Sequence, residues 1–134
     1  MAKIGIVEAF RAYGAKLANA QWAVSAEIPG GVVMSLWESE FRKSEMRYVD
    51  RLSRWRGPGN SLFRKHLQLA YENKLPISLV IAKASDPEAV RRGEDASKIP
   101  KTFAVRKDLV GSVEKLAGDE FEIEFTLRTP KPHG

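Results

Sequence analysis

The chain has 134 residues, a net charge of +5 and no cysteine, with 43% of its residues hydrophobic and 29% charged. This composition is typical of a globular protein and the length of one domain, while the lack of cysteine excludes disulfides, thiolate catalysis and cysteine-bound zinc. Because no apolar run is long enough to cross a membrane and the first residues lack the pattern of a secretory signal, we expect a cytoplasmic protein without a membrane partner.

The first third of the chain predicts a helix followed by a β-hairpin. Apolar residues at helical spacing indicate a helix from Ile4 to Tyr13. Alternating residues then predict a strand from Gln21 to Ile28. A second strand from Val32 to Trp37 returns after the turn signal Pro29-Gly30-Gly31.

The middle of the chain predicts a strand, a helix and a buried strand. The strand from Met46 to Ser53 alternates, although Asp50 interrupts its apolar face. After Gly57-Pro58-Gly59, Asn60 is a typical helix N-cap, and an apolar stripe continues the helix to Asn73. Residues 76–82 are apolar on both faces, as in a central strand.

The last third of the chain predicts a short helix and more strands. Asp86-Pro87 begins the helix and Gly93 ends it. A strand follows from Thr102 to Arg106, and a closing hairpin pairs Val110–Ala117 with Glu120–Leu127 across Gly118-Asp119. Four apolar residues of the last strand are expected to point inward: Phe121, Ile123, Phe125 and Leu127.

These elements predict an α+β fold: a mainly antiparallel sheet or small open β-barrel of about six or seven strands, with two or three packed helices. We expect one domain over residues 1–128 and a flexible tail over residues 129–134, where two prolines lie close together. Hairpins at both ends of the chain are the main reason for expecting antiparallel pairing.

The positive charge is concentrated in residues 42–65, here called the basic segment. It contains eight cations and two acidic residues, so the rest of the chain is nearly neutral. The cations are Arg42, Lys43, Arg47, Arg51, Arg54, Arg56, Arg64 and Lys65. Cations that neutralise phosphates, interleaved with aromatic rings on which bases stack, are typical of nucleic-acid surfaces. The segment predicts a polyanionic partner, DNA or RNA.

The most specific part of the basic segment lies around Trp55. Arg54 and Arg56 flank this tryptophan, and a glycine-rich stretch leads to the helix start at Asn60. Free backbone N–H groups at a helix start favour a phosphate oxygen. We therefore predict that this cluster binds phosphate and that Trp55 contacts bases.

Two other interpretations of the basic segment remain open. Its cations could pair with Glu38, Glu40, Glu45 and Asp50, and Trp55 could fix a loop to the core. The segment could instead bind an acidic protein face, including the Glu120, Glu122 and Glu124 row of a second copy in a homo-oligomer. A row of acids of this kind could also merely keep an edge strand soluble.

A second predicted site lies on the first hairpin. If Ser25, Ser35 and Trp37 share a face, they form a shallow pocket for the flat ring of an unpaired or modified base. The alternative is that Trp37 packs in the core. In the first arrangement the Trp37 ring is accessible to a ligand, and in the second it is buried.

Signals for catalysis are weak. Glu94, Asp95 and Lys98, together with Asp50 or Glu38, could form the magnesium site of a small nuclease, but their spacing matches no motif. His66 could act as a general base or be a satisfied, half-buried histidine. We assign no catalytic residue and expect neither a metal nor a cofactor. The sequence therefore favours a non-enzymatic nucleic-acid-binding module, with a protein-interaction module and a magnesium-dependent nuclease as alternatives.

Overall fold

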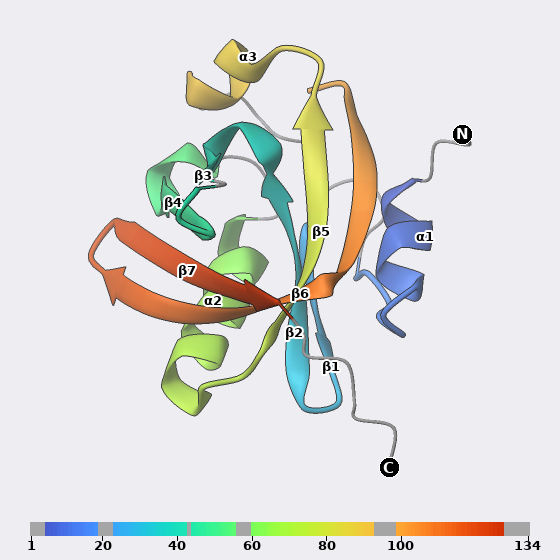
Figure 1. The fold of residues 1–134 in the computed structure, drawn as a ribbon, viewed down its shortest axis with the longest axis vertical. Coiled ribbons are helices and arrows are strands. Elements are labelled where there is room, and N and C mark those ends of the chain that lie inside the picture. The colour runs from blue at the N-terminus through green and yellow to red at the C-terminus, as the bar shows by residue number, and fades with distance from the viewer. Residues whose placement is uncertain (1–4, 19–22, 43, 56–59, 93–98, 128–134) are drawn as a thin grey trace.

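The computed structural model describes residues 5–18, 23–42, 44–55, 60–92 and 99–127. Within these ranges one mixed sheet contains seven strands: β1 (Ser25–Ile28), β2 (Gly31–Trp37), β3 (Phe41–Arg42), β4 (Arg47–Arg51), β5 (Ile77–Ala84), β6 (Lys101–Ala117) and β7 (Glu120–Leu127). Their spatial order is β1-β2-β5-β6-β7-β4-β3, so the sheet is open, with β1 and β3 at its edges (Figure 1). Only β2 and β5 run parallel. The predicted α+β fold with a mainly antiparallel sheet is confirmed.

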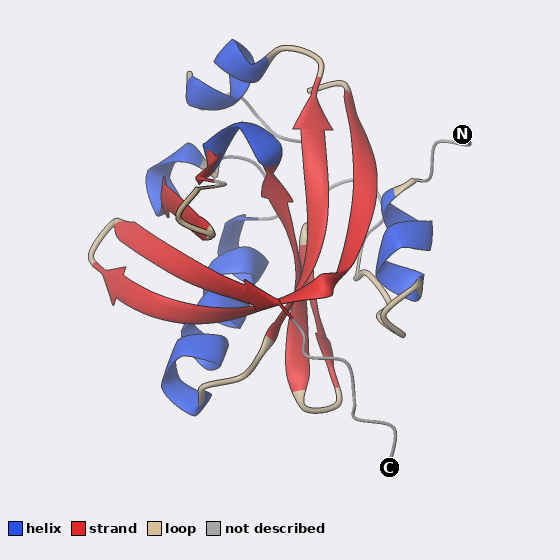
Figure 2. Ribbon diagram, viewed as in Figure 1, coloured by secondary structure: helices blue, strands red, loops and turns tan. Residues whose placement is uncertain are grey.

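Helices cover both faces of the sheet (Figure 2). They are α1 (Ile6–Arg11), α2 (Asn60–Asn73) and α3 (Pro87–Arg91), with the short 3-10 helices η1 (Glu38–Glu40) and η2 (Leu52–Arg54). The larger apolar core lies between the sheet and α2, which contributes Phe63 and Leu67. A smaller core lies under α1, where Phe10 packs with Val33 and Val80.

None of the helices in the described part of the chain has the length and apolar character that a bilayer crossing requires.

Two turn signals and one cap signal in the sequence are confirmed, whereas Asn60, predicted as a helix N-cap, is the first residue of α2 and its side chain bonds to Leu52, Trp55 and Arg64 instead of capping the helix. Pro29-Gly30 connects β1 to β2, and Gly30 has a φ of +76°, which favours glycine. Gly118-Asp119 connects β6 to β7 with a φ of +60° at Gly118. Asp86 caps α3, because its carboxylate accepts a hydrogen bond from the Glu88 backbone N–H at 3.1 Å.

The long strand β6 differs from the prediction of two separate strands. Its 17 residues continue through Lys107-Asp108, pairing first with β5 and then with β7. A register shift in the pairing with β5 allows the strand to bend instead of ending. At Gly111 a Cβ atom would lie 2.6 Å from the Phe125 ring, so the bend brings the backbone onto the core.

Strand β7 has the predicted bounds, and Phe121, Ile123 and Phe125 point into the core. Leu127 does not, because it is 68% exposed at the end of the strand, where the core no longer covers it. β7 also lies between β6 and β4, so it is not an edge strand. A role of its acidic row in protecting a sheet edge is therefore excluded.

Candidate nucleic-acid interface

The basic segment extends over β3, β4, η2 and the first turns of α2. Its described cations are Arg42 in β3, Arg47 and Arg51 in β4, and Arg64 and Lys65 in α2. Lys43 and Arg56 lie outside the described residues, as does the side chain of Arg54. The described cations of the segment therefore come from two strands and a helix and do not follow one strand.

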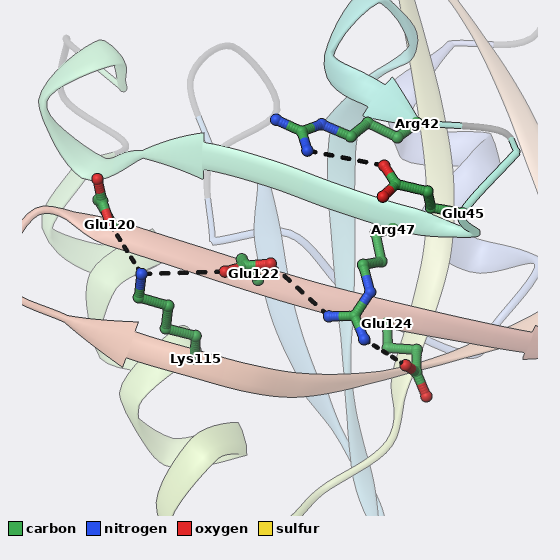
Figure 3. A network of polar contacts seen from close by, with 7 residues as sticks. All are labelled: Arg42, Glu45, Arg47, Lys115, Glu120, Glu122 and Glu124. Carbon is green, nitrogen blue, oxygen red and sulfur yellow. Dashed lines mark hydrogen bonds and ion pairs between the residues drawn. The ribbon is translucent and has the colours of Figure 1, made fainter.

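Arg47 is held by acidic residues of the neighbouring strand (Figure 3). It lies opposite Glu124 in the β4–β7 ladder, and its guanidinium nitrogens are 2.8 Å from a Glu124 oxygen and 3.6 Å from a Glu122 oxygen. Opposite charges facing each other across strands stabilise the pairing. Arg47 is thus engaged within the sheet, although with acids other than those weighed from the sequence.

Arg42 remains accessible despite an ion pair. A guanidinium nitrogen of Arg42 lies 3.6 Å from a Glu45 oxygen, and both side chains are more than half exposed. An exposed pair of this kind contributes little and is readily exchanged for another anion. Arg42 is therefore available to a phosphate, whereas Arg47 is not.

The acidic row of β7 is paired within the chain (Figure 3). The Nζ of Lys115 lies 2.9 Å from a Glu120 oxygen and 4.0 Å from a Glu122 oxygen. The hydrogen bond between Lys115 and Glu120 raises the pKa of the lysine and lowers that of the glutamate. These carboxylates therefore have cationic neighbours in the same chain, and an assembly through them would have to replace those contacts.

Arg51 and Arg64 approach the same turn from two elements, and we call this pair the basic corner. Asp119, in the turn between β6 and β7, accepts hydrogen bonds from the Ser53 N–H at 2.8 Å and the Ser53 hydroxyl at 2.6 Å. These bonds lower the pKa of Asp119, and the charges of Arg64 and Arg51 lower it further. Both guanidinium groups are thus near one carboxylate while remaining exposed.

Asn60 orders the basic corner in a way the sequence did not predict. It is the first residue of α2, and its side-chain amide donates to the backbone oxygens of Leu52, at 3.2 Å, and Trp55. Its side-chain oxygen accepts from the Arg64 Nε at 2.8 Å. Asn60 therefore ties the helix start to η2 and orients Arg64.

Trp55 lies in the core and is not placed to contact bases. Its ring is stacked on Phe63, with centroids 4.1 Å apart and planes 10° from parallel, and the residue is 5% exposed. The indole N–H donates to Asp50 Oδ2 at 3.0 Å. The predicted base contact by Trp55 is corrected: the ring faces of this tryptophan are occupied by the protein itself.

Asp50 interrupts the apolar face of β4 because it is a buried acceptor. The residue is 4% exposed, and its Oδ2 also accepts from the Tyr48 hydroxyl at 2.8 Å. Its Oδ1 accepts from the Arg51 backbone N–H at 2.8 Å. Burial and the Asp50 charge together raise the pKa of Tyr48, which keeps its hydroxyl protonated as a donor.

An open pocket of about 400 Å³ lies where β3 begins, beside β4, and we call it the β3–β4 pocket. Strand β3 pairs only with Arg47 and Tyr48, so residues 49–51 of β4 have no neighbouring strand on that side. The pocket is lined by Ser39, Glu40, Phe41, Arg42, Val49, Asp50, Arg51, Glu120 and Glu122. It joins two predicted cations, Arg42 and Arg51, to residues that were not part of the predicted nucleic-acid site.

Among the pocket residues outside the predicted nucleic-acid site, one carried a usable signal in the sequence. Asp50 was an acid on an apolar face, which marks a polar site inside the fold. Glu40 and Phe41 had no such signal, because they reach the pocket only through the short pairing of β3 with β4. The pocket is a product of tertiary structure.

The predicted pocket of Ser25, Ser35 and Trp37 does not form. Ser25 pairs with Met34 across the hairpin, so it shares the face of Met34, and the adjacent Ser35 points to the other face. Trp37, the last residue of β2, is 6% exposed and packs in the larger core, with its ring centroid 6.4 Å from that of Trp55. The alternative that Trp37 is a core residue is correct.

Ser25 instead contacts His66 in α2. Its hydroxyl lies 2.7 Å from His66 Nδ1, and the Glu27 carboxylate lies 3.6 Å from Nε2. Burial lowers the pKa of His66 from 6.5, Glu27 opposes this effect and Lys65 adds to it. His66 is thus a satisfied, buried histidine that favours the neutral form.

We expect this histidine to make the fold sensitive to acid. Because its pKa is lower in the folded than in the unfolded chain, the stabilisation is complete above about pH 6.5 and is lost as the pH falls through the folded value. Urea unfolding at about pH 7.5 and about pH 5.5 should show a smaller loss for His66→Gln than for the wild type. Glu27→Gln should enlarge the loss, and equal losses in all three proteins would contradict this account.

The residues weighed for a nuclease are not brought together in the described structure. Glu94, Asp95 and Lys98 lie outside the described residues, and Asp50 is occupied by three hydrogen bonds. Among the residues that are described, no group of three acidic or histidine side chains could hold a metal ion.

Comparison with known proteins gives no match: no family model, no curated protein and no solved structure is similar to this chain.

Proposed function

We propose that this chain binds nucleic acid through the basic corner and the rim of the β3–β4 pocket. The observation that carries the proposal is the position of Arg51, which belongs to both. Arg42 stands at the same pocket, and Arg64 is oriented by Asn60 at the corner. Exposed guanidinium groups beside a pocket large enough for a nucleobase fit a phosphate chain with an unpaired base.

An acidic protein partner would use the same arginines but not the pocket. A protein surface of glutamates and aspartates offers carboxylates to Arg51 and Arg64, but its carboxylate side chains have no flat ring that would use the pocket beside Arg51. The pocket beside the cations therefore favours nucleic acid over this alternative.

The double variant Arg51→Ala/Arg64→Ala tests the proposal. We expect weaker binding to a fluorescent oligonucleotide, measured by anisotropy over a range of salt concentrations. Removing two phosphate contacts should reduce the slope of log K against log salt by about 1.4 to 1.8. Thermal unfolding of the variant should stay close to that of the wild type, because both side chains are exposed.

The matched control is Arg11→Ala/Lys83→Ala, which removes the same charge from exposed positions in α1 and β5. It should leave the salt slope unchanged. The proposal is wrong if the wild-type chain shows no salt-dependent binding to single-stranded or duplex oligonucleotides, or if both double variants weaken binding equally.

A further inference from the structure

We infer that the Asp119 carboxylate occupies the position of a phosphate group in the basic corner, and that a phosphate of the bound nucleic acid displaces it. The inference rests on the proposed function, because it names the group with which nucleic acid competes there. It makes Ser53, Arg51 and Arg64 a subsite for one phosphate, and it makes Asp119 the residue that limits the affinity of this subsite.

The donors around the Asp119 carboxylate are groups that a phosphate also accepts from. One carboxylate oxygen accepts from the Ser53 N–H at 2.8 Å, and the other accepts from the Ser53 hydroxyl at 2.6 Å. Carboxylates and phosphates are both oxyanions, and hydrogen bonds to either are strengthened by the negative charge. The contact therefore suits an oxyanion in general and not only a carboxylate.

Arg51 and Arg64 reach Asp119 from two different elements. Arg51 ends β4 opposite the first residue of β7, which directly follows Asp119 in the chain. Arg64 comes from α2 and is oriented by Asn60. The hydrogen bonds of Ser53 lower the pKa of Asp119, and the charges of Arg64 and Arg51 lower it further. Both guanidinium groups therefore act on the same carboxylate.

The basic corner keeps positive charge although it contains a carboxylate, because two guanidinium groups share Asp119. The neighbouring acid Glu120 is hydrogen-bonded to Lys115 at 2.9 Å, so this pair adds no net charge. Glu122, farther along β7, lies 3.6 Å from a guanidinium nitrogen of Arg47. An approaching phosphate is therefore attracted to the corner while Asp119 still occupies it.

The Asp119 side chain can leave without movement of the turn that carries it. The Leu52 N–H donates to the Asp119 backbone oxygen at 2.7 Å, and this bond does not involve the carboxylate. Asp119 and Ser53 are both exposed, and contacts between exposed charged groups contribute little to stability. The exchange needs only rotation of one side chain, and release of counterions from the nucleic acid favours it.

Asp119→Asn tests the inference, because it removes the charge and keeps the size of the side chain. We expect this variant to bind the fluorescent oligonucleotide at least about fivefold more tightly than the wild type, since the phosphate no longer displaces a charged acceptor from Ser53. Glu114→Gln, at an exposed acid of the same β6–β7 hairpin, is the matched control. It should raise the affinity less than about twofold, because salt screens a distant exposed charge. Thermal unfolding of both variants should stay close to that of the wild type.

The two arginines decide whether the gain is local. In the Arg51→Ala/Arg64→Ala background, Asp119→Asn should raise the affinity less than about twofold, because the cations of the subsite are absent. An equal gain in both backgrounds would overturn the inference, as would a gain no larger than that of Glu114→Gln. Either result would leave the proposed function intact.

Inorganic phosphate tests the subsite without nucleic acid. In an NMR titration, phosphate should shift the Ser53 amide resonance, and it should do so at lower concentration in Asp119→Asn than in the wild type. Sodium chloride at equal ionic strength is the control. Failure of the wild type to bind any oligonucleotide would overturn the proposed function, and the titration then decides the subsite by itself. A Ser53 resonance that responds equally to phosphate and chloride in both proteins would overturn the inference.

Discussion

Replacing Asp50 with alanine is expected to lower the free energy of unfolding by about 3–5 kcal/mol. The substitution leaves the buried Tyr48 hydroxyl and the Trp55 indole N–H without their common acceptor. Each buried donor left unsatisfied costs about 1–3 kcal/mol, and the lost side chain adds a void. Urea unfolding followed by tryptophan fluorescence would measure this change.

A comparison with Asp50→Asn separates the charge from the shape. The amide keeps one oxygen that can accept from Tyr48 and Trp55. Its NH₂ group then faces the Arg51 backbone N–H, another donor, which in the wild type donates to Asp50 Oδ1. We expect an intermediate loss of about 2–3 kcal/mol. Asp108→Ala, which removes an exposed acid of β6, is the control and should change stability little. A loss for Asp50→Ala no larger than for Asp108→Ala would contradict the role of Asp50.

Local signals in the sequence predicted the elements whose structure depends on neighbouring residues. The bounds of β7 and α2 follow from alternation and helical spacing, and the turns at Gly30 and Gly118 follow from the freedom of glycine to adopt a positive φ. The cap at Asp86 needs only the next two residues. These features did not require knowledge of what packs against them.

Features that depend on pairing between distant residues were not predictable in the same way. Two separate strands, Thr102–Arg106 and Val110–Ala117, were predicted, but pairing with two different neighbouring strands carries β6 through the residues between them. Ser25 and Ser35 were placed on one face because the register of the hairpin was unknown, and a shift of one residue reverses every side chain. The β3–β4 pocket likewise depends on how short the pairing of β3 is.

Which cations of the basic segment are paired inside the fold could likewise not be predicted from the sequence. A sum along the chain gives Arg47 the same weight as Arg51, yet only Arg47 lies opposite Glu124 in the sheet. Arg51 also has an acid across the ladder, but Glu120 is hydrogen-bonded to Lys115. Which cations remain available is therefore decided by the strand order, in which β7 is the neighbour of β4.

Trp55→Ala is expected to destabilise the fold by about 3–5 kcal/mol, because it removes a buried indole from the core and opens a cavity beside Phe63. Trp55→Phe keeps an aromatic ring and loses the hydrogen bond to Asp50, so its loss should be smaller, at about 1–3 kcal/mol. Tyr71→Ala, at a 42% exposed aromatic residue of α2, is the control and should change stability little. Chemical denaturation of the four proteins would measure these differences.

The same Trp55 variants distinguish a core tryptophan from a base-stacking one. If Trp55 belongs to the core, oligonucleotide affinity measured well below the unfolding temperature should be the same for Trp55→Phe and the wild type. A stacking platform would give the opposite pattern for Trp55→Ala: unfolding like the wild type, with affinity reduced by about 1–3 kcal/mol for each stacked base. Because both faces of the indole are enclosed by the protein, we expect the first pattern, and nucleic-acid binding should then depend on Arg51 and Arg64.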